Sequence, residues 1–112
     1  EWGAMFVAWC AKESGISTDI IPKYAGCTFG MNWFKERNGW GDQGKYTPKP
    51  GDIIFFSGDT ENVSSHTGIV IACDGVNVYT IEGNTSNMVA KREYSLTSTY
   101  VKGYGIPNYR RN

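Results

Sequence analysis

The start of the chain carries apolar side chains at helical spacing. They recur at i, i+3, i+4, i+7 and i+8, at Trp2, Met5, Phe6, Trp9 and Cys10. This spacing predicts one apolar stripe on an amphipathic helix. Gly15 is typical of the residue that ends a helix, with Ile16 packing back over the last turn. We therefore expect a first helix over about residues 3–14.

A second, shorter helix is predicted after an irregular stretch at residues 17–27 that contains Pro22 and Gly26. Thr28 is a candidate N-cap, and the helix should continue to about Arg37, where Asn38-Gly39 ends it. Residues 38–51 contain four glycines and two prolines, which predicts a long loop.

From residue 52 onward the pattern changes to that of strands. Residues 52–56 form a short and nearly continuous apolar run, which is typical of a strand buried on both faces. Further strands are predicted at residues 67–72, 76–81, 88–94 and 101–106. Strands at this spacing after two helices predict an α+β fold with an antiparallel, barrel-like sheet.

Composition narrows the class of protein. The chain has 112 residues, 40% of them hydrophobic, which suits one domain over residues 1–112 that folds rather than stays disordered. Lys+Arg and Asp+Glu balance at 11 each, without a basic run, so we expect no nucleic-acid partner. No apolar stretch approaches the ~20 residues of a membrane span. Because the chain begins almost within a helix, we expect it to be a fragment of a longer protein.

The cysteines and the histidine give no sign of a metal or a cofactor. Cys10, Cys27 and Cys73 show no CxxC spacing of the kind that zinc sites or redox pairs use. One disulfide with one free thiol is an open alternative, but three buried apolar thiols is the favoured interpretation. The single histidine excludes a site built from several histidines.

The hairpin at residues 73–75 brings candidate chemistry together. If these residues form a three-residue loop with Gly75 in the left-handed position, His66 lies opposite Glu82 on one face of the sheet. A two-residue turn would shift the register by one and place Thr67 opposite Glu82 instead. The first register pairs an imidazole with a carboxylate, as an oriented general base requires.

Asn84 follows two residues after Glu82, where its amide could orient the imidazole or donate to an oxyanion. Each residue also has a plain structural interpretation. His66 would be a strand-end histidine, Glu82 a solvated charge and Asn84 a turn residue. Their joint occurrence favours the functional interpretation.

A pair of this kind needs a nucleophile, and a helix N-terminus lowers the pKa of a thiol. Position 3 is that location, but it is occupied by Gly3. Cys10 lies seven residues later, about 10 Å along the helix axis. It falls on the apolar stripe, so a packing thiol is favoured over a nucleophile there.

Four segments, whose order and spacing span nearly the whole chain, then point to a known family. They are WGAMFVAWC at residues 2–10, PGDIIFF at 50–56, SHTGIV at 65–70 and YTIEGN at 79–84. They resemble the opening helix, the "PGD" strand, the histidine strand and the glutamate/asparagine strand of CHAP domains. These are cysteine, histidine-dependent amidohydrolases/peptidases of the wider NlpC/P60 group.

The resemblance implies a papain-like α+β fold, with N-terminal helices packed on a small antiparallel, SH3-like barrel. Gly3 would occupy the nucleophile position and Cys10 that of a second, non-catalytic cysteine. His66 would act as base and then acid, Glu82 would orient it and Asn84 would assist.

The resemblance also implies a monomeric, extracellular cell-wall enzyme without a metal or cofactor. It would cut amide bonds in peptidoglycan stem or cross-bridge peptides, as an amidase or as an endopeptidase.

The glycine at position 3 predicts that this chain is inactive, because glycine has no side chain with which to attack a carbonyl. It would be either a deliberate replacement or a natural loss, and the retained His66, Glu82 and Asn84 favour a recent or deliberate one. The alternative function is a non-catalytic module that binds cell-wall peptides. Trp33, Trp40 and Tyr79 are candidate contacts for it, with core or rim packing as their structural interpretation.

Overall fold

The computed structural model describes residues 2–84, 86 and 88–111. Two helices precede the main strands: α1 (Trp2–Glu13) and α2 (Cys27–Glu36). The strands are β1 (Trp40–Asp42), β2 (Ile53–Ser57), β3 (Ser64–Cys73), β4 (Asn77–Gly83), β5 (Val89–Ser95) and β6 (Val101–Gly105). A 3-10 turn, η1 (Tyr109–Arg111), follows. The α+β class and both predicted helices are confirmed.

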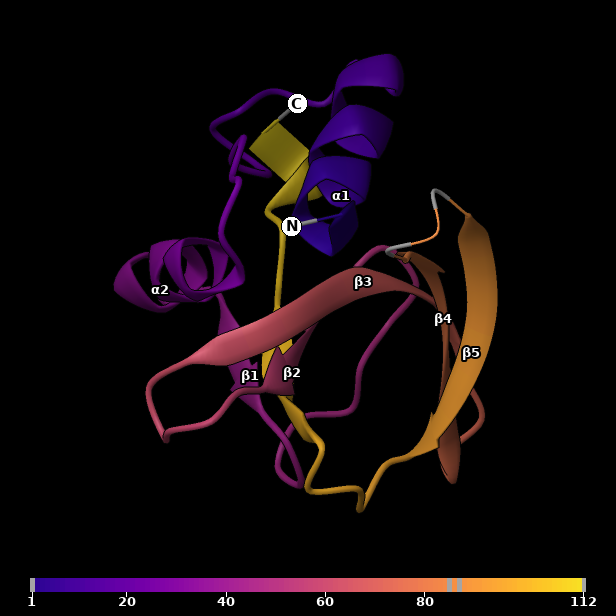
Figure 1. Cartoon of the computed structure of the whole chain (residues 1–112). Helices are drawn as coiled ribbons and strands as arrows, with labels where there is room; N and C mark the ends of the chain where they lie inside the picture. The colour runs from indigo at the N-terminus through magenta and orange to yellow at the C-terminus, as the bar shows by residue number, and fades with distance from the viewer. Residues whose placement is uncertain (1, 85, 87, 112) are drawn as a thin grey trace.

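The six strands form one antiparallel sheet in the order β1-β6-β2-β3-β4-β5. The sheet curves strongly, with α1 over the end that carries β3 and β4 and with α2 beside it (Figure 1). It stays open, with β1 and β5 at its two edges. The expected barrel closure is therefore wrong, although the order of helices and antiparallel strands is as predicted.

Both helices end in the way that the sequence predicts. Gly15 has a φ of 73°, the Gly15 N–H bonds the Lys12 carbonyl, and the Ile16 N–H bonds the Ala11 carbonyl. This is the double hydrogen bond that closes a helix on a left-handed residue. Asn38, with a φ of 56°, closes α2 in the same manner.

The apolar stripe of α1 does not face the core. The buried face of α1 consists of small residues, namely Gly3, Ala4, Val7 and Ala11. Trp2, Met5 and Trp9 are exposed instead, Trp9 to 60%. Small side chains let the helix backbone approach the sheet closely, and Gly83 on β4 lies directly against Phe6 for the same reason. The bulky residues Trp2, Met5 and Trp9 of the stripe therefore point outward, whereas Phe6 and Cys10 are half-buried.

Strand β2 is buried on both faces, as its continuous apolar run predicts. Ile53 and Phe55 pack in the cluster under the two helices. Ile54 and Phe56 pack in a second cluster on the opposite face, with residues of β4 and β6.

Two details of the predicted elements are wrong. Residues 38–51 are not all loop, because residues 40–42 form β1 and pair with β6. Thr28 does not cap α2, whose N-cap is Gly26. The Thr28 hydroxyl instead accepts a hydrogen bond from the Ser64 N–H at 3.1 Å, and so ties α2 to the start of β3.

Candidate active site

The N-terminal end of α1 lies directly against the His66 imidazole. An ideal Cβ built on Gly3 would stand 2.6 Å from the His66 Cε1 atom, 2.7 Å from its Nδ1 atom and 2.8 Å from the Thr67 carbonyl oxygen. Position 3 and His66 are therefore in direct contact, as the sequence predicts. A side chain at position 3 would find no open space, because the imidazole rests on the glycine.

The other side of the imidazole is held by Glu82. The Glu82 Oε1 atom lies 3.0 Å from the His66 Nε2 atom. With the Nε2 proton donated to this carboxylate, the Nδ1 lone pair faces position 3, which is the orientation of a general base. The ring also stacks on Phe56, with centroids 5.5 Å apart.

Glu82 is itself braced from two strands. Its second oxygen accepts hydrogen bonds from the Thr80 hydroxyl at 2.6 Å and from the Tyr94 hydroxyl at 2.8 Å. Burial alone would raise the pKa of Glu82, but the hydrogen bonds from His66, Thr80 and Tyr94 outweigh it and the pKa is lowered. The carboxylate is therefore held in its charged form.

Thr80 and Tyr94 were not among the site residues predicted from the sequence. The place of Thr80 could have been predicted from the sequence, because Thr80 precedes Glu82 by two residues and so shares its face of β4. The place of Tyr94 could not have been predicted in this way, because its contact with Glu82 depends on how β5 pairs with β4.

The predicted hairpin register is wrong, although the residues it was meant to join do meet. Ile69 pairs with Ile81 and Val70 with Thr80, a register shifted by two residues from the predicted one. The shift preserves the face on which each side chain lies, since alternation has a period of two. His66 therefore reaches Glu82 diagonally.

Gly68 on β3 makes room for this diagonal contact. A Cβ at Gly68 would stand 2.6 Å from the Glu82 Cγ atom and 3.1 Å from the Ile81 carbonyl oxygen. A side chain at this position would push the carboxylate away from the imidazole.

Gly3, His66 and Glu82 all lie in the part of the chain that matches a known family. A family model of the CHAP domain matches residues 1–84. The chain belongs to the CHAP family. No match was found among curated proteins.

Two solved structures share the CHAP fold seen here. A crystal structure of Ly7917 with the hydrolyzing product of MDP has a TM-score of 0.58 and 22% identity, and covers 90% of this chain and 51% of Ly7917. Another crystal structure of Ly7917 has a TM-score of 0.51 and 24% identity, and covers 84% of this chain and 41% of the other. The present chain thus spans about half of the matched chain or less.

Asn84, the third polar residue proposed from the CHAP motif, follows β4. Its side-chain oxygen accepts hydrogen bonds from the Ser86 N–H at 2.9 Å and from the Met88 N–H at 3.3 Å. These contacts link the Asn84 side chain to the backbone of Ser86 and of Met88. They fit the interpretation of Asn84 as a turn residue, and its catalytic role stays a prediction.

The three aromatic residues proposed as substrate contacts lie in different places. Trp33 packs edge-on against Phe34, and the Arg37 guanidinium lies over its ring at 4.0 Å. Trp40 packs near Phe55 in the cluster under the helices. The Tyr79 hydroxyl donates to Asp74 at 2.8 Å, at the β3–β4 turn. These contacts are those of core and rim packing, and substrate binding by the three stays a prediction.

Cys10, Cys27 and Cys73 form no disulfide with one another. Cys27 is buried, as expected. Cys10 and Cys73 are half-buried, so the expectation of a buried thiol is wrong for these two. Burial raises the pKa of Cys10, which is the opposite of what a nucleophile requires.

Among residues 2–84, 86 and 88–111, no group of three or more His, Cys, Asp or Glu side chains is placed to hold a metal ion. Within the same residues, neither helix has the length and apolar character of a membrane span.

Proposed function

We propose that this chain is a peptidoglycan amide-hydrolase domain of the CHAP type that lacks its nucleophile and therefore does not cut. The contact between Gly3 and the His66 ring carries the proposal. Gly3, which we assign to the family's cysteine position, lies at the N-terminus of α1, against the Nδ1 atom of an imidazole whose Nε2 atom is paired with Glu82. The base and its orienting carboxylate are present, and the attacking atom is absent.

The proposed substrate is an amide bond in cell-wall peptidoglycan, and the proposed location is the extracellular cell wall. Membership of the CHAP family supports both. Ly7917, which shares the fold, was crystallised with the hydrolyzing product of MDP, and this supports the same class of substrate.

A thiol at position 3 would complete the chemistry. The His66 Nδ1 atom would take its proton, and the thiolate sulfur would bond to the amide carbonyl carbon. The C–N bond then breaks, the amine leaves with the proton from His66, and a thioester remains. Water, deprotonated by the same imidazole, attacks the thioester, releases the acid and regenerates the thiol.

The decisive experiment is Gly3→Cys, assayed on purified cell walls by mass spectrometry of the soluble products. We expect amide cleavage by this variant and none by the unaltered chain. Gly3→Ser and Gly3→Ala are matched controls for the added bulk. Gly3→Cys combined with His66→Ala tests whether any activity depends on the imidazole. A sugar fragment freed from its peptide would identify an amidase, and new peptide ends would identify an endopeptidase.

The fit of the new side chain must be checked in the same experiment. The imidazole can swing aside, since it is the end of a side chain that is 22% exposed, but the Thr67 carbonyl oxygen belongs to the backbone. Circular dichroism and alkylation of the introduced thiol would show that the variant is folded and accessible. A folded, alkylatable variant without amide cleavage would refute the hydrolase assignment.

The second candidate function, binding of cell-wall peptides without cleavage, is favoured by an apolar groove beside α1 that carries two lysines. Sedimentation of the unaltered chain with purified cell walls tests it. A chain that stays in the supernatant at all protein concentrations would rule this function out.

A further inference from the structure

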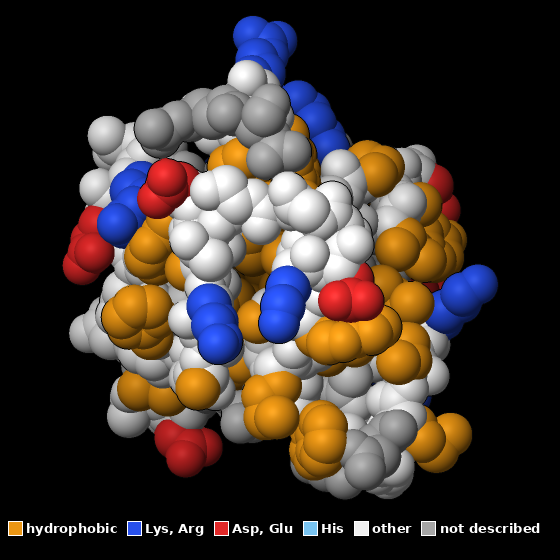
Figure 2. Space-filling model, turned by 90° about the horizontal axis from the view of Figure 1, so that it is seen from above, with side chains coloured by type: hydrophobic (Ala, Val, Ile, Leu, Met, Phe, Trp, Pro, Cys, Tyr) orange, Lys and Arg blue, Asp and Glu red, His pale blue; other side chains and the backbone are white. Residues whose placement is uncertain are grey.

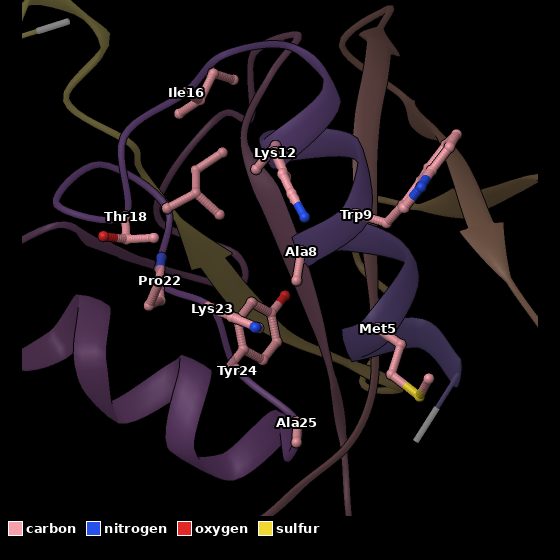
Figure 3. Close-up of a pocket in the computed structure, with 12 residues that line it drawn as sticks. Met5, Ala8, Trp9, Lys12, Ile16, Thr18, Pro22, Lys23, Tyr24 and Ala25 are labelled. Atoms are coloured by element: carbon pink, nitrogen blue, oxygen red, sulfur yellow. The ribbon is translucent and has the colours of Figure 1, made fainter.

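A groove of about 610 Å³ runs along α1 on the side that faces the segment between the two helices (Figure 3). Its floor is apolar and includes the buried residues Ala11, Ile21 and Pro22. Met5 and Trp9, from the outward-facing stripe of α1, form one wall. The volume lies within the ~300–1,000 Å³ of sites that take small ligands.

The charged side chains that line the groove are basic. Lys12, in the last turn of α1, and Lys23, before α2, both line it, and none of its described lining residues is acidic. In Figure 3 both lysine side chains extend over the space between α1 and the facing segment. Seen from above, the molecule presents hydrophobic side chains around a hollow, with lysine or arginine side chains beside it (Figure 2). An apolar floor under two ammonium groups complements a ligand that is both aliphatic and anionic.

One end of the groove lies at the N-terminal half of α1, although Gly3, His66 and Glu82 are not among its lining residues. Tyr24 lines the groove, and its hydroxyl lies 3.0 Å from the Thr67 Oγ1 atom. The carbonyl oxygen of the same Thr67 is one of the atoms against the Cβ position of Gly3. Met5, at the other wall, lies on a different face of α1 from Gly3. A ligand in the groove would therefore lie along α1, from Met5 toward Lys12.

We propose that this groove binds a short acidic peptide, with small aliphatic side chains on the apolar floor and carboxylates at Lys12 and Lys23. The peptide occupant, rather than another anion, rests on the proposed function, because an amide hydrolase must hold the chain that flanks its scissile bond. The groove then serves as the binding site for that flanking segment.

The test uses acetyl-alanyl-glutamyl-alanine and its uncharged counterpart, in which both carboxylates are amides. Affinity is measured by calorimetry on the unaltered chain. Lys12→Met combined with Lys23→Met removes both charges and keeps the length of the side chains. Lys45→Met, on the exposed turn after β1, is the matched control.

We expect the charged peptide to bind, and its Kd to rise on the order of fivefold in the double variant, since two exposed ion pairs are lost. The uncharged peptide should bind the unaltered chain and the double variant equally weakly, and Lys45→Met should change neither. Equal binding of the two peptides would overturn the proposal, as would no binding at all. Lysine-dependent capture by phosphatidylglycerol vesicles, without peptide binding, would show a membrane site and also overturn it.

These outcomes can be separated from failure of the hydrolase assignment. A folded but inactive Gly3→Cys variant, together with lysine-dependent peptide binding, would refute the hydrolase and retain the groove. An active Gly3→Cys variant whose KM is unaffected by the two lysine changes would refute the groove and retain the hydrolase.

Discussion

The candidate site has a sheet half, formed by His66 and Glu82, and a helix half, formed by Gly3. The two halves differ in what holds them in place. On the sheet, Glu82 is only 4% exposed and its two oxygens have three side-chain partners. On the helix, Gly3 contributes no functional group, and the site of a side chain is closed by the His66 ring and the Thr67 carbonyl oxygen. One half is a complete hydrogen-bond network, whereas the other is a close contact between a backbone and a ring.

This difference changes what the retained residues mean. The sequence suggested that an intact His66 and Glu82 favour a recent or deliberate loss of the nucleophile. In the structure, Glu82 also satisfies two buried or half-buried hydroxyl groups, so its removal would cost stability whether or not the site is active. The presence of the imidazole–carboxylate pair therefore gives no evidence that a nucleophile was lost recently or deliberately.

The largest expected effect comes from breaking the sheet half. Glu82→Ala would leave the Thr80 and Tyr94 hydroxyls and the His66 ring without their shared acceptor. We expect the free energy of unfolding to fall by about 3 kcal/mol, which corresponds to a Tm lower by roughly 10–20 °C. Urea unfolding measures it. Glu93→Ala, at an exposed position on β5, should stay within about 0.5 kcal/mol of the unaltered chain. A loss below about 1 kcal/mol for Glu82→Ala would mean that the network does little for stability.

A smaller effect is expected on the helix half. Gly3→Ala should lower the free energy of unfolding by about 1–2 kcal/mol, because its Cβ would meet the imidazole and the backbone of β3 at under 3 Å. The better helix propensity of alanine offsets this only in part.

The contribution of the ring can be isolated with a double-mutant cycle. In a His66→Ala background, Gly3→Ala should cost about 1 kcal/mol less, since the Thr67 carbonyl oxygen is then the remaining obstacle. Equal costs in the two backgrounds would show that the ring does not press on position 3.

Sequence patterns predicted the sheet half better than the helix half. The parity of strand positions put His66 and Glu82 on one face, and this survived a register error of two residues. The register itself failed because the turn is longer than predicted: Cys73 pairs with Val78, which shifts the pairing beside the turn by three residues. The irregularity between Val70 and Ala72 then reduces the shift to two, and the sequence shows no sign of it.

The orientation of α1 could not be predicted from periodicity. Both its apolar stripe and its small-residue face repeat at helical spacing, and hydrophobicity favours the stripe. What decides is how closely the helix must approach the sheet, since Phe6 meets Gly83 and Gly3 meets His66. This information lies in β3 and β4, far along the chain. The outward stripe is also what gives the proposed peptide groove its wall.

The charge of Glu82 should make the stability of the fold depend on pH. Because the folded-state pKa of Glu82 is lowered, its contribution to stability is fully present above the unfolded pKa of about 4.3, and is lost as the pH falls through the folded value. Asp52 acts in the opposite sense. Burial raises its pKa, so its carboxylate destabilises the fold at neutral pH, and acid relieves the penalty.

The unaltered chain shows the balance of these two groups, and comparison with Glu82→Gln isolates one of them. Glu82→Gln should be less stable than the unaltered chain near neutral pH, and the gap should narrow as the pH is taken below about 4. Urea unfolding of both proteins across this range measures the gap, and Asp52→Asn should leave it in place. A gap that stays constant with pH would mean that the carboxylate is held no more strongly as an anion in the folded chain than in the unfolded one.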